Sequence, residues 1–143
     1  MGAVSSAEPE TLRIDGSYGE GGGQILRTAL SLSVALGRGI RFENIRAKRP
    51  KPGLRPQHLM SVRAAAQISG ALVEGDRVGS GELVFLPQHR PAGGAYTLDV
   101  GSTEAGGSAG AVSLVFQTVF LPLSLTDMSS DLTLVGGTHV GQI

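Results

Sequence analysis

Hydrophobic and polar positions follow two periods along this chain, one typical of helices and one typical of strands. Apolar side chains at helical spacing predict three helices, over residues 24–36, 57–69 and 111–121. Gly37 and Gly70 directly follow the first two, where glycine commonly ends a helix. The third should end near position 122, because the proline there cannot donate the hydrogen bond that a continuing helix needs.

Shorter segments between these helices have the composition and alternation of strands. The predicted strands cover residues 12–15, 40–44, 71–74, 82–86, 96–100 and 132–135. The resulting order is strand, helix, strand, helix, three strands, helix, strand. This order predicts an α+β fold, a helix layer packed on a sheet, rather than a helical bundle or a sandwich. The order of the strands within the sheet stays open.

Length and composition limit the class of protein. The chain has 143 residues, which suits one domain with a hydrophobic core. Twelve basic and twelve acidic side chains cancel, so the net charge does not indicate a partner, and local clusters of charge become informative. The 22 glycines have no period, which argues against a collagen-like chain and predicts tight turns.

The absence of cysteine excludes a disulfide framework and a thiolate metal site. It also fits a reducing compartment, and we expect the protein in the cytoplasm. Residues 1–10 lack the apolar segment of a secretory signal and are interpreted as a loose tail. No apolar stretch is long enough to span a bilayer, so we expect no membrane association.

A glycine-rich stretch, residues 15–24, lies between the first predicted strand and the first predicted helix. Such a loop lets the backbone approach an anion, and the helix start adds free N–H groups and a positive dipole end. The spacing matches neither a Walker loop nor the dinucleotide fingerprint. Within it, Glu20 is interpreted either as a ligand of Mg²⁺ or Mn²⁺ or as a complement to the helix dipole. The stretch as a whole has a plain alternative as a tight turn.

A second candidate is the basic segment 46–55, which carries five basic residues, no acidic one and two prolines. Arginine grips phosphate with a planar fork, and prolines lower the entropy cost of binding. Arg27, in the first turn of the preceding helix, could join this segment. The alternative is a solvated basic loop.

Polar residues at two further helix starts complete the candidates. Gln57 and His58 open the second helix, and His58 is more often a structural residue in such a place than a catalytic one. Residues 106–110 form a second glycine-rich stretch before the third helix, which carries Gln117 in an otherwise apolar run. If that amide is buried, it needs partners in the protein or in a ligand. The histidines do not show metal-ligand spacing, and no serine-hydrolase elbow is present.

In this order the segments resemble the RNA 3′-terminal phosphate cyclase family, over residues 12–139. The most specific match is Gly-Glu-Gly-Gly-Gly-Gln-Ile-Leu-Arg, residues 19–27. Further matches fall at residues 45–49, 51–59, 109–118 and 136–138. The resemblance implies a fold of repeated units, each with two helices on a four-stranded sheet, related to 5-enolpyruvylshikimate-3-phosphate synthase.

The resemblance also implies a reaction of the ligase class and a set of site residues. The family uses ATP and a divalent metal to convert an RNA 3′-phosphate into a 2′,3′-cyclic phosphate. AMP is first transferred to a histidine and then to the RNA end, where the neighbouring 2′-OH attacks. By position, Glu20 corresponds to the metal-binding carboxylate. The residues expected to bind ATP, phosphate and the RNA end are Gly21, Gly22, Gly23, Arg27, Arg46, Arg49, Gln57 and Gln117.

Two departures from the family qualify this expectation. The adenylated histidine belongs to a C-terminal half without a counterpart here, so we expect residues 11–143 to be the N-terminal part of the catalytic domain. None of His58, His89 and His139 matches that nucleophile, and the chain alone should be inactive. Residues 101–107 also look longer than the family's usual segment before the third helix.

Three alternatives remain open. One is the non-catalytic branch of the family, which serves in ribosome assembly, although the retained site residues favour the true cyclase. Another is a carboxyvinyl transferase of related fold that acts on a phosphorylated small molecule. The third is a domain without activity, whose exposed apolar surface would drive association with itself or with a partner chain.

Overall fold

The computed structural model describes residues 11–100 and 111–137. Its helices are α1 (Gly23–Leu36), α2 (Pro56–Ser69) and α3 (Ala111–Ser124). Its strands are β1 (Leu12–Asp15), β2 (Ile40–Glu43), β3 (Leu72–Glu74), β4 (Leu83–Leu86), β5 (Gly94–Asp99) and β6 (Ser130–Val135). The predicted order of elements and the α+β class are confirmed. The predicted tail, residues 1–10, lies outside the described residues.

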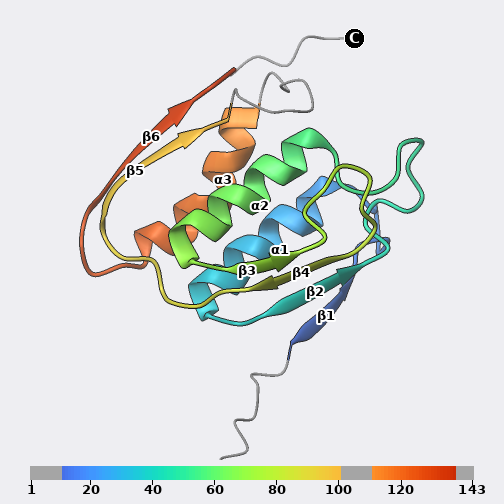
Figure 1. The fold of residues 1–143 in the computed structure, drawn as a ribbon, viewed down its shortest axis with the longest axis horizontal. Coiled ribbons are helices and arrows are strands. Elements are labelled where there is room, and N and C mark those ends of the chain that lie inside the picture. Colours follow the sequence, from blue (N-terminus) through green and yellow to red (C-terminus); the bar gives the residue numbers. More distant parts are fainter. Residues whose placement is uncertain (1–10, 101–110, 138–143) are drawn as a thin grey trace, which may run out of the picture.

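The first six elements form a unit of two helices on a four-stranded sheet. The strand order is β1-β2-β4-β3, with β1 parallel to β2 and the other two pairings antiparallel. The parallel pair needs a crossover, which α1 supplies. Figure 1 shows α1 and α2 on one face of this sheet. This unit matches the repeated unit that the family resemblance implies.

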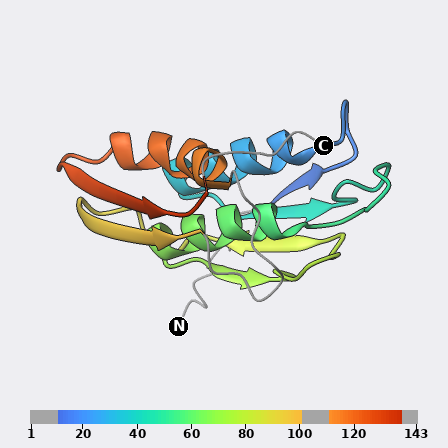
Figure 2. The same ribbon diagram turned by 90° about the horizontal axis from the view of Figure 1, so that it is seen from above.

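The remaining elements repeat the start of that unit. Strands β5 and β6 pair in parallel from Gly94↔Ser130 to Asp99↔Val135, and α3 connects them, as α1 connects β1 and β2. Helix α3 packs against both α1 and α2. The helices therefore lie between the four-stranded sheet and the β5–β6 pair, an arrangement also visible from above (Figures 1 and 2).

The core lies where α1 and α2 cover the sheet. Phe42 of β2 and Phe85 of β4 are fully buried there, together with Leu30 of α1. Ile45 and Leu54, at the two ends of the basic segment, are 3% and 0% exposed. Burial of these two apolar side chains anchors the segment on the core and fixes where its arginines lie.

Several predicted boundaries were wrong by one to three residues; β5 and β6, for example, each begin two residues earlier than predicted. Two of the differences have a clear local cause. Helix α3 continues past Pro122 to Ser124. Proline in the last turn removes only one backbone hydrogen bond, and the continued helix buries Leu123. Strand β2 ends at Glu43 because Asn44 has a left-handed φ of 55°.

Among the described residues, no helix is both long enough and apolar enough to cross a bilayer.

Candidate anion-binding site

The glycine-rich loop between β1 and α1 leaves the start of α1 open. Gly19 and Gly21 have φ values of 63° and 66°, which side-chain-bearing residues rarely adopt. The carboxylate of Asp15 holds the beginning of the loop by accepting hydrogen bonds from the backbone N–H and the hydroxyl of Ser17, at 3.0 and 2.6 Å. None of the described side chains caps α1 at Gly22, so the first N–H groups of the helix are available to a ligand.

The basic segment between β2 and α2 is folded back on itself. Arg46 has a left-handed φ of 50°, and its Nη1 donates to the carbonyls of Lys51 and Gly53 at 2.6 and 3.1 Å. The backbone of Leu54 donates to Ser80 and accepts from Gly79, which ties the segment to the turn before β4. The basic segment is therefore not a freely solvated loop, because its arginines lie on a backbone that is held at both ends.

The two loops and the starts of α1 and α2 enclose a hollow of about 310 Å³, called the basic hollow below. Its lining residues are Tyr18, Glu20, Gly21, Gly22, Gly23, Gln24, Ile25, Arg27, Arg46, Arg49, Gln57 and His58. Three guanidinium groups therefore face one carboxylate. With the exception of Gln117, every residue predicted to bind ATP, phosphate, the RNA end or metal lies in this hollow.

Arg49 and Glu20 form an ion pair at the mouth of the hollow. Nη2 of Arg49 donates to Oε1 and to the backbone carbonyl of Glu20, both at 3.1 Å. The Glu20 side chain is 86% exposed, so water weakens this attraction. A Cβ at Gly22 would lie 3.0 Å from Nη2 of Arg49, so glycine lets the guanidinium rest against the loop.

The interior of the basic hollow has a surplus of positive charge. Burial lowers the pKa of Arg27, whose Nε has no hydrogen-bond partner among the described residues. The pKa of Arg46 is also lowered, first by burial and then by the neighbouring Arg49 and Arg55. A bound anion would offset the repulsion between these arginines and offset the unpaired charge of Arg27. The electrostatics of the hollow therefore favour an anionic ligand.

His58 lines the basic hollow, although its position in the sequence favoured a purely structural role. Its side chain is only 1% exposed, and its Nδ1 accepts the backbone N–H of Arg55 at 2.9 Å. Burial lowers its pKa to about 4, with further contributions from Arg46, Arg27 and Arg55. The imidazole is therefore neutral at pH 7.

The structure does not bring Gln117 into the basic hollow. Helix α3 directs Val115, Thr118 and Val119 inward, and the helical period then turns position 117 to the exposed side. The premise that this amide is buried was wrong. The glycine-rich stretch 106–110 and His139 lie outside the described residues.

Sequence reasoning did not single out Tyr18, Gln24 and Ile25, which also line the hollow. Only their position next to the glycines of the loop indicated that they could line the site. Ile25 carries no chemical signal of its own, because an apolar residue at a helix start has the same appearance as a core residue.

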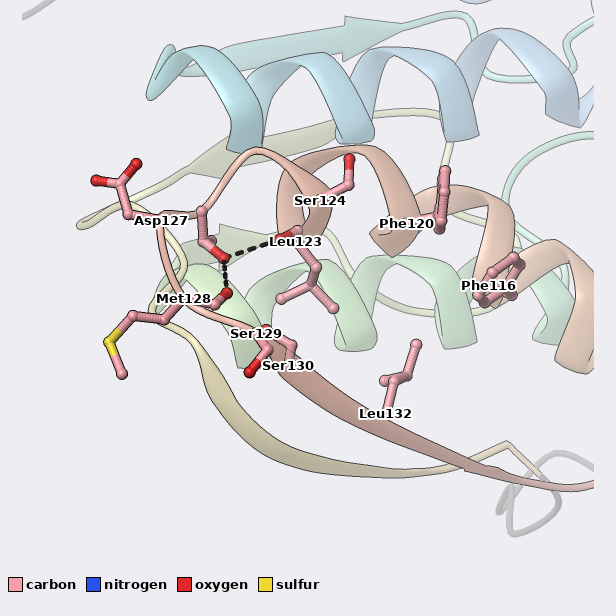
Figure 3. Close-up of a pocket in the computed structure, with 10 residues that line it drawn as sticks. Phe116, Phe120, Leu123, Ser124, Asp127, Met128, Ser129, Ser130 and Leu132 are labelled. Atoms are coloured by element: carbon pink, nitrogen blue, oxygen red, sulfur yellow. Dashed lines mark hydrogen bonds between the residues drawn. The ribbon is translucent and has the colours of Figure 1, made fainter.

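A larger hollow of about 490 Å³ lies beside α3 and has a different character. Phe116, Phe120 and Leu123 come from α3, and Leu132 comes from β6 (Figure 3). Asp127 is the one charged residue among the described residues that line this hollow. An apolar hollow without a basic group does not suit a phosphate, so the basic hollow is the better candidate despite its smaller size.

The donor set for a metal is small. Within the described residues, no three acidic, histidine or cysteine side chains cluster closely enough to hold a metal. Among the described residues that line the basic hollow, Glu20 is the one with a carboxylate. Mg²⁺ commonly binds through one or two carboxylates plus substrate phosphates and water, and Glu20 fits that mode of binding.

Fold and site together define an α+β protein with a basic, glycine-lined anion pocket where two helices begin. Comparison with known proteins agrees with this class and narrows it. The sequence model of a family described as "RNA 3'-terminal phosphate cyclase" matches residues 18–142. The chain belongs to the RNA 3′-terminal phosphate cyclase family.

Relatives from bacteria and archaea carry the name RNA 3′-terminal phosphate cyclase. The protein from Methylococcus capsulatus is 57% identical over 129 residues, 90% of this chain and 36% of the relative. The protein from Archaeoglobus fulgidus is 54% identical over 90% of this chain and 37% of its own length. The protein from Korarchaeum cryptofilum is 47% identical over 92% of this chain and 36% of its own length. The chain thus spans little more than a third of these relatives.

Proposed function

We propose that this chain supplies the phosphate-binding part of an enzyme that uses ATP to convert an RNA 3′-phosphate end into a 2′,3′-cyclic phosphate. The observation that carries the proposal is the basic hollow, where Arg27, Arg46 and Arg49 surround the open start of α1. The names of the relatives support cyclisation of an RNA 3′-terminal phosphate, and the use of ATP is part of the proposal. Both ATP and the 3′-phosphate end of RNA are rich in phosphate, which this hollow suits.

Each group in the hollow has a physical task in this proposal. The arginines neutralise phosphate oxygens, and Gln57 offers an amide that can donate to an oxygen and accept from a hydroxyl. The glycines let the backbone N–H groups at the start of α1 reach the same oxygens. Phosphate-transfer reactions depend mainly on such positioning and charge stabilisation.

Glu20 would hold a divalent Mg²⁺ or Mn²⁺ in this scheme. A bound metal would supply positive charge next to the phosphates. The carboxylate sits exposed at the mouth of the hollow, where it can share a cation with phosphate oxygens and water. Arg49, now paired with Glu20, would then be free to donate to a phosphate.

We propose further that the reaction passes AMP through a histidine to the RNA end, and that none of the three histidines of this chain is the acceptor. His58 is buried with Nδ1 accepting from Arg55, and His89 is exposed away from the basic hollow. His139 lies outside the described residues, and by sequence none of the three matches the family's adenylated histidine. The chain alone should therefore acquire no covalent AMP from labelled ATP, and acid-labile label on it would contradict this part of the proposal.

The function is tested with the intact gene product, an RNA oligonucleotide labelled in its 3′-phosphate, ATP and either Mg²⁺ or Mn²⁺. Cyclisation makes the label resistant to alkaline phosphatase, and we expect resistance only when ATP is present. Arg46→Ala should lower the rate by roughly 100-fold, because it removes a charged donor from the hollow. Arg63→Ala, which changes an exposed residue of α2 outside the hollow, should have no effect.

Label that stays sensitive to phosphatase under all conditions would contradict the proposed reaction. The non-catalytic branch of the family would then be favoured if RNA still bound. Stabilisation of the protein by phosphoenolpyruvate but not by ATP would instead favour a carboxyvinyl transferase.

A further inference from the structure

An exposed aromatic ring lies at the basic hollow. Among the large apolar and aromatic side chains that the structure describes, Tyr18 is the most exposed, at 78%, and it lines the hollow. Tyr96, by contrast, packs against the core and donates its hydroxyl to the carbonyl of Ala92 at 2.7 Å. In the described part of the chain the ring–ring contact is between Phe116 and Phe120, so the Tyr18 ring has no aromatic partner there. The ring therefore contributes little to the core and is free to meet a ligand.

The turn that carries Tyr18 is held by backbone contacts. The N–H of Tyr18 donates to the carbonyl of Asp15, and its carbonyl accepts the N–H of Gly21, both at 3.2 Å. A Cβ at Gly16 would lie 3.0 Å from the Cα of Ile45, so the loop rests directly on the chain that leads into the basic segment. Because this backbone is already ordered, a ligand that stacks on the ring immobilises little more than the ring itself. The entropy cost of such a contact is therefore low.

The lining of the basic hollow combines two kinds of chemistry. Its three arginines suit phosphate oxygens. Among the described lining residues, Tyr18 and Ile25 are the ones with large apolar or aromatic side chains. A flat ring adds nothing to the binding of a bare phosphate, but it can stack on a nucleobase, since every base has a π-face. The ligand that uses both parts of the lining is a nucleotide, which carries a phosphate and a base on one ribose.

We propose that Tyr18 is a platform on which the terminal base of the RNA stacks while the 3′-phosphate of the same nucleotide lies in the basic hollow. The inference rests on the proposed function and adds to it a contact with the nucleoside. ATP also carries a base, but stacking on aromatic side chains is the common way in which proteins recognise the unpaired bases of RNA ends. We therefore assign the platform to RNA, and the experiment below separates the two sources.

A stacking platform has a specific kinetic consequence. One ring discriminates little between bases, so RNA ends that differ only in the terminal base should bind within about 3-fold of one another. The contact lies on the base rather than on the reacting phosphate, and it is equally strong before and during the reaction. Loss of the ring should therefore raise KM and leave kcat unchanged.

The test uses the intact gene product and two 3′-phosphorylated RNA oligonucleotides, identical except that one ends in an abasic ribose. Tyr18→Ser should weaken binding of the complete end by roughly 10-fold and leave binding of the abasic end unchanged. Tyr18→Phe keeps the ring and should bind both ends like the parent. Leu72→Ser, which removes a large exposed side chain from β3 outside the hollow, is the matched control and should also bind like the parent.

A spectroscopic readout reports the stacking itself. The fluorescence of 2-aminopurine, placed as the terminal base, is quenched when the base stacks, so it should fall on binding to the parent and to Tyr18→Phe but not to Tyr18→Ser.

Three results would overturn the platform. An equal loss of affinity for both ends in Tyr18→Ser would assign the residue to the shape of the loop. A parent that binds the two ends equally well, or neither of them, would show that the base is not held. A loss of affinity for ATP in Tyr18→Ser, with RNA binding unchanged, would place the adenine on the ring instead. Base-dependent RNA binding through Tyr18 without formation of a cyclic phosphate would retain the platform and refute the proposed reaction.

Discussion

At the scale of single residues, His58 gives the molecule a pH dependence. Its pKa is about 4 in the folded chain, against 6.5 for a free imidazole. Between these values the unfolded chain binds the proton and the folded chain does not, so stability falls as the pH falls from 6.5 to 4. The full difference corresponds to up to about 3 kcal/mol. Denaturant unfolding of the parent and of His58→Gln at pH 7.5 and 5 should show a smaller pH effect in the variant. An equal effect in both would contradict this origin, and His89→Gln should match the parent.

Glu20 is predicted to restrain Arg49 when no metal is bound. Glu20→Gln removes the carboxylate from the ion pair and lowers the negative charge of the basic hollow. Phosphate should then bind roughly 3- to 10-fold more tightly in the presence of a chelator, a modest gain because the pair is exposed. Any enhancement of phosphate binding by Mg²⁺ or Mn²⁺ should be lost. The matched control is Glu43→Gln, which breaks the 2.6 Å pair with Arg13 in the four-stranded sheet. Weaker phosphate binding by Glu20→Gln would contradict the restraint.

The residues of the basic hollow were largely predictable, because charge and glycine clustered within two short stretches. Glu20 and Arg49 lie in different loops, and the structure shows that they form an ion pair. The surroundings of Gln117 were not predictable in this way, because they depend on which side of α3 packs inward. His58 was visible as a residue, but the direction of its ring depends on a backbone hydrogen bond that a sequence does not record.

At the scale of elements, the basic segment depends on a close backbone approach. Gly53 has a φ of 81°, and a Cβ there would overlap with the backbone carbonyl of Gly79. Gly53→Ala should destabilise the chain by about 2–4 kcal/mol and weaken phosphate binding, since the carbonyls that hold Arg46 would move. Gly81→Ala is the matched control, because a Cβ there meets no atom within 4 Å. Thermal unfolding and phosphate titration of both variants check this, and equal stability of the two would contradict it.

The elements themselves were predictable in order and type, since helical and strand periods alternate clearly along the chain. Their ends were less so. Pro122 signals an end, but burial of Leu123 favours one more turn of α3. Strand order was not predictable, because the position of β4 between β2 and β3 depends on long-range pairing rather than on any local pattern.

At the scale of the whole molecule, one flank is apolar and open. Large apolar side chains are exposed around α3 and the turn that follows it, and they are Phe116, Phe120, Leu121, Leu125 and Met128. Such a surface favours association, so we expect this chain to form larger species as its concentration rises. Replacing both phenylalanines by serine should shift sedimentation velocity profiles towards the monomer. Leu36→Ser, which changes a still more exposed leucine at the end of α1, should not. A parent chain that stays monomeric at high concentration would contradict this expectation.

Among the residues that the structure describes, those that line the basic hollow all lie between positions 18 and 58. Elements β5, α3 and β6 contribute none of its lining. A ligand in the hollow would raise the free energy of global unfolding of the chain. Because α3 packs against both helices that begin at the hollow, the ligand would stabilise the β5–α3–β6 part through α1 and α2 rather than by direct contact.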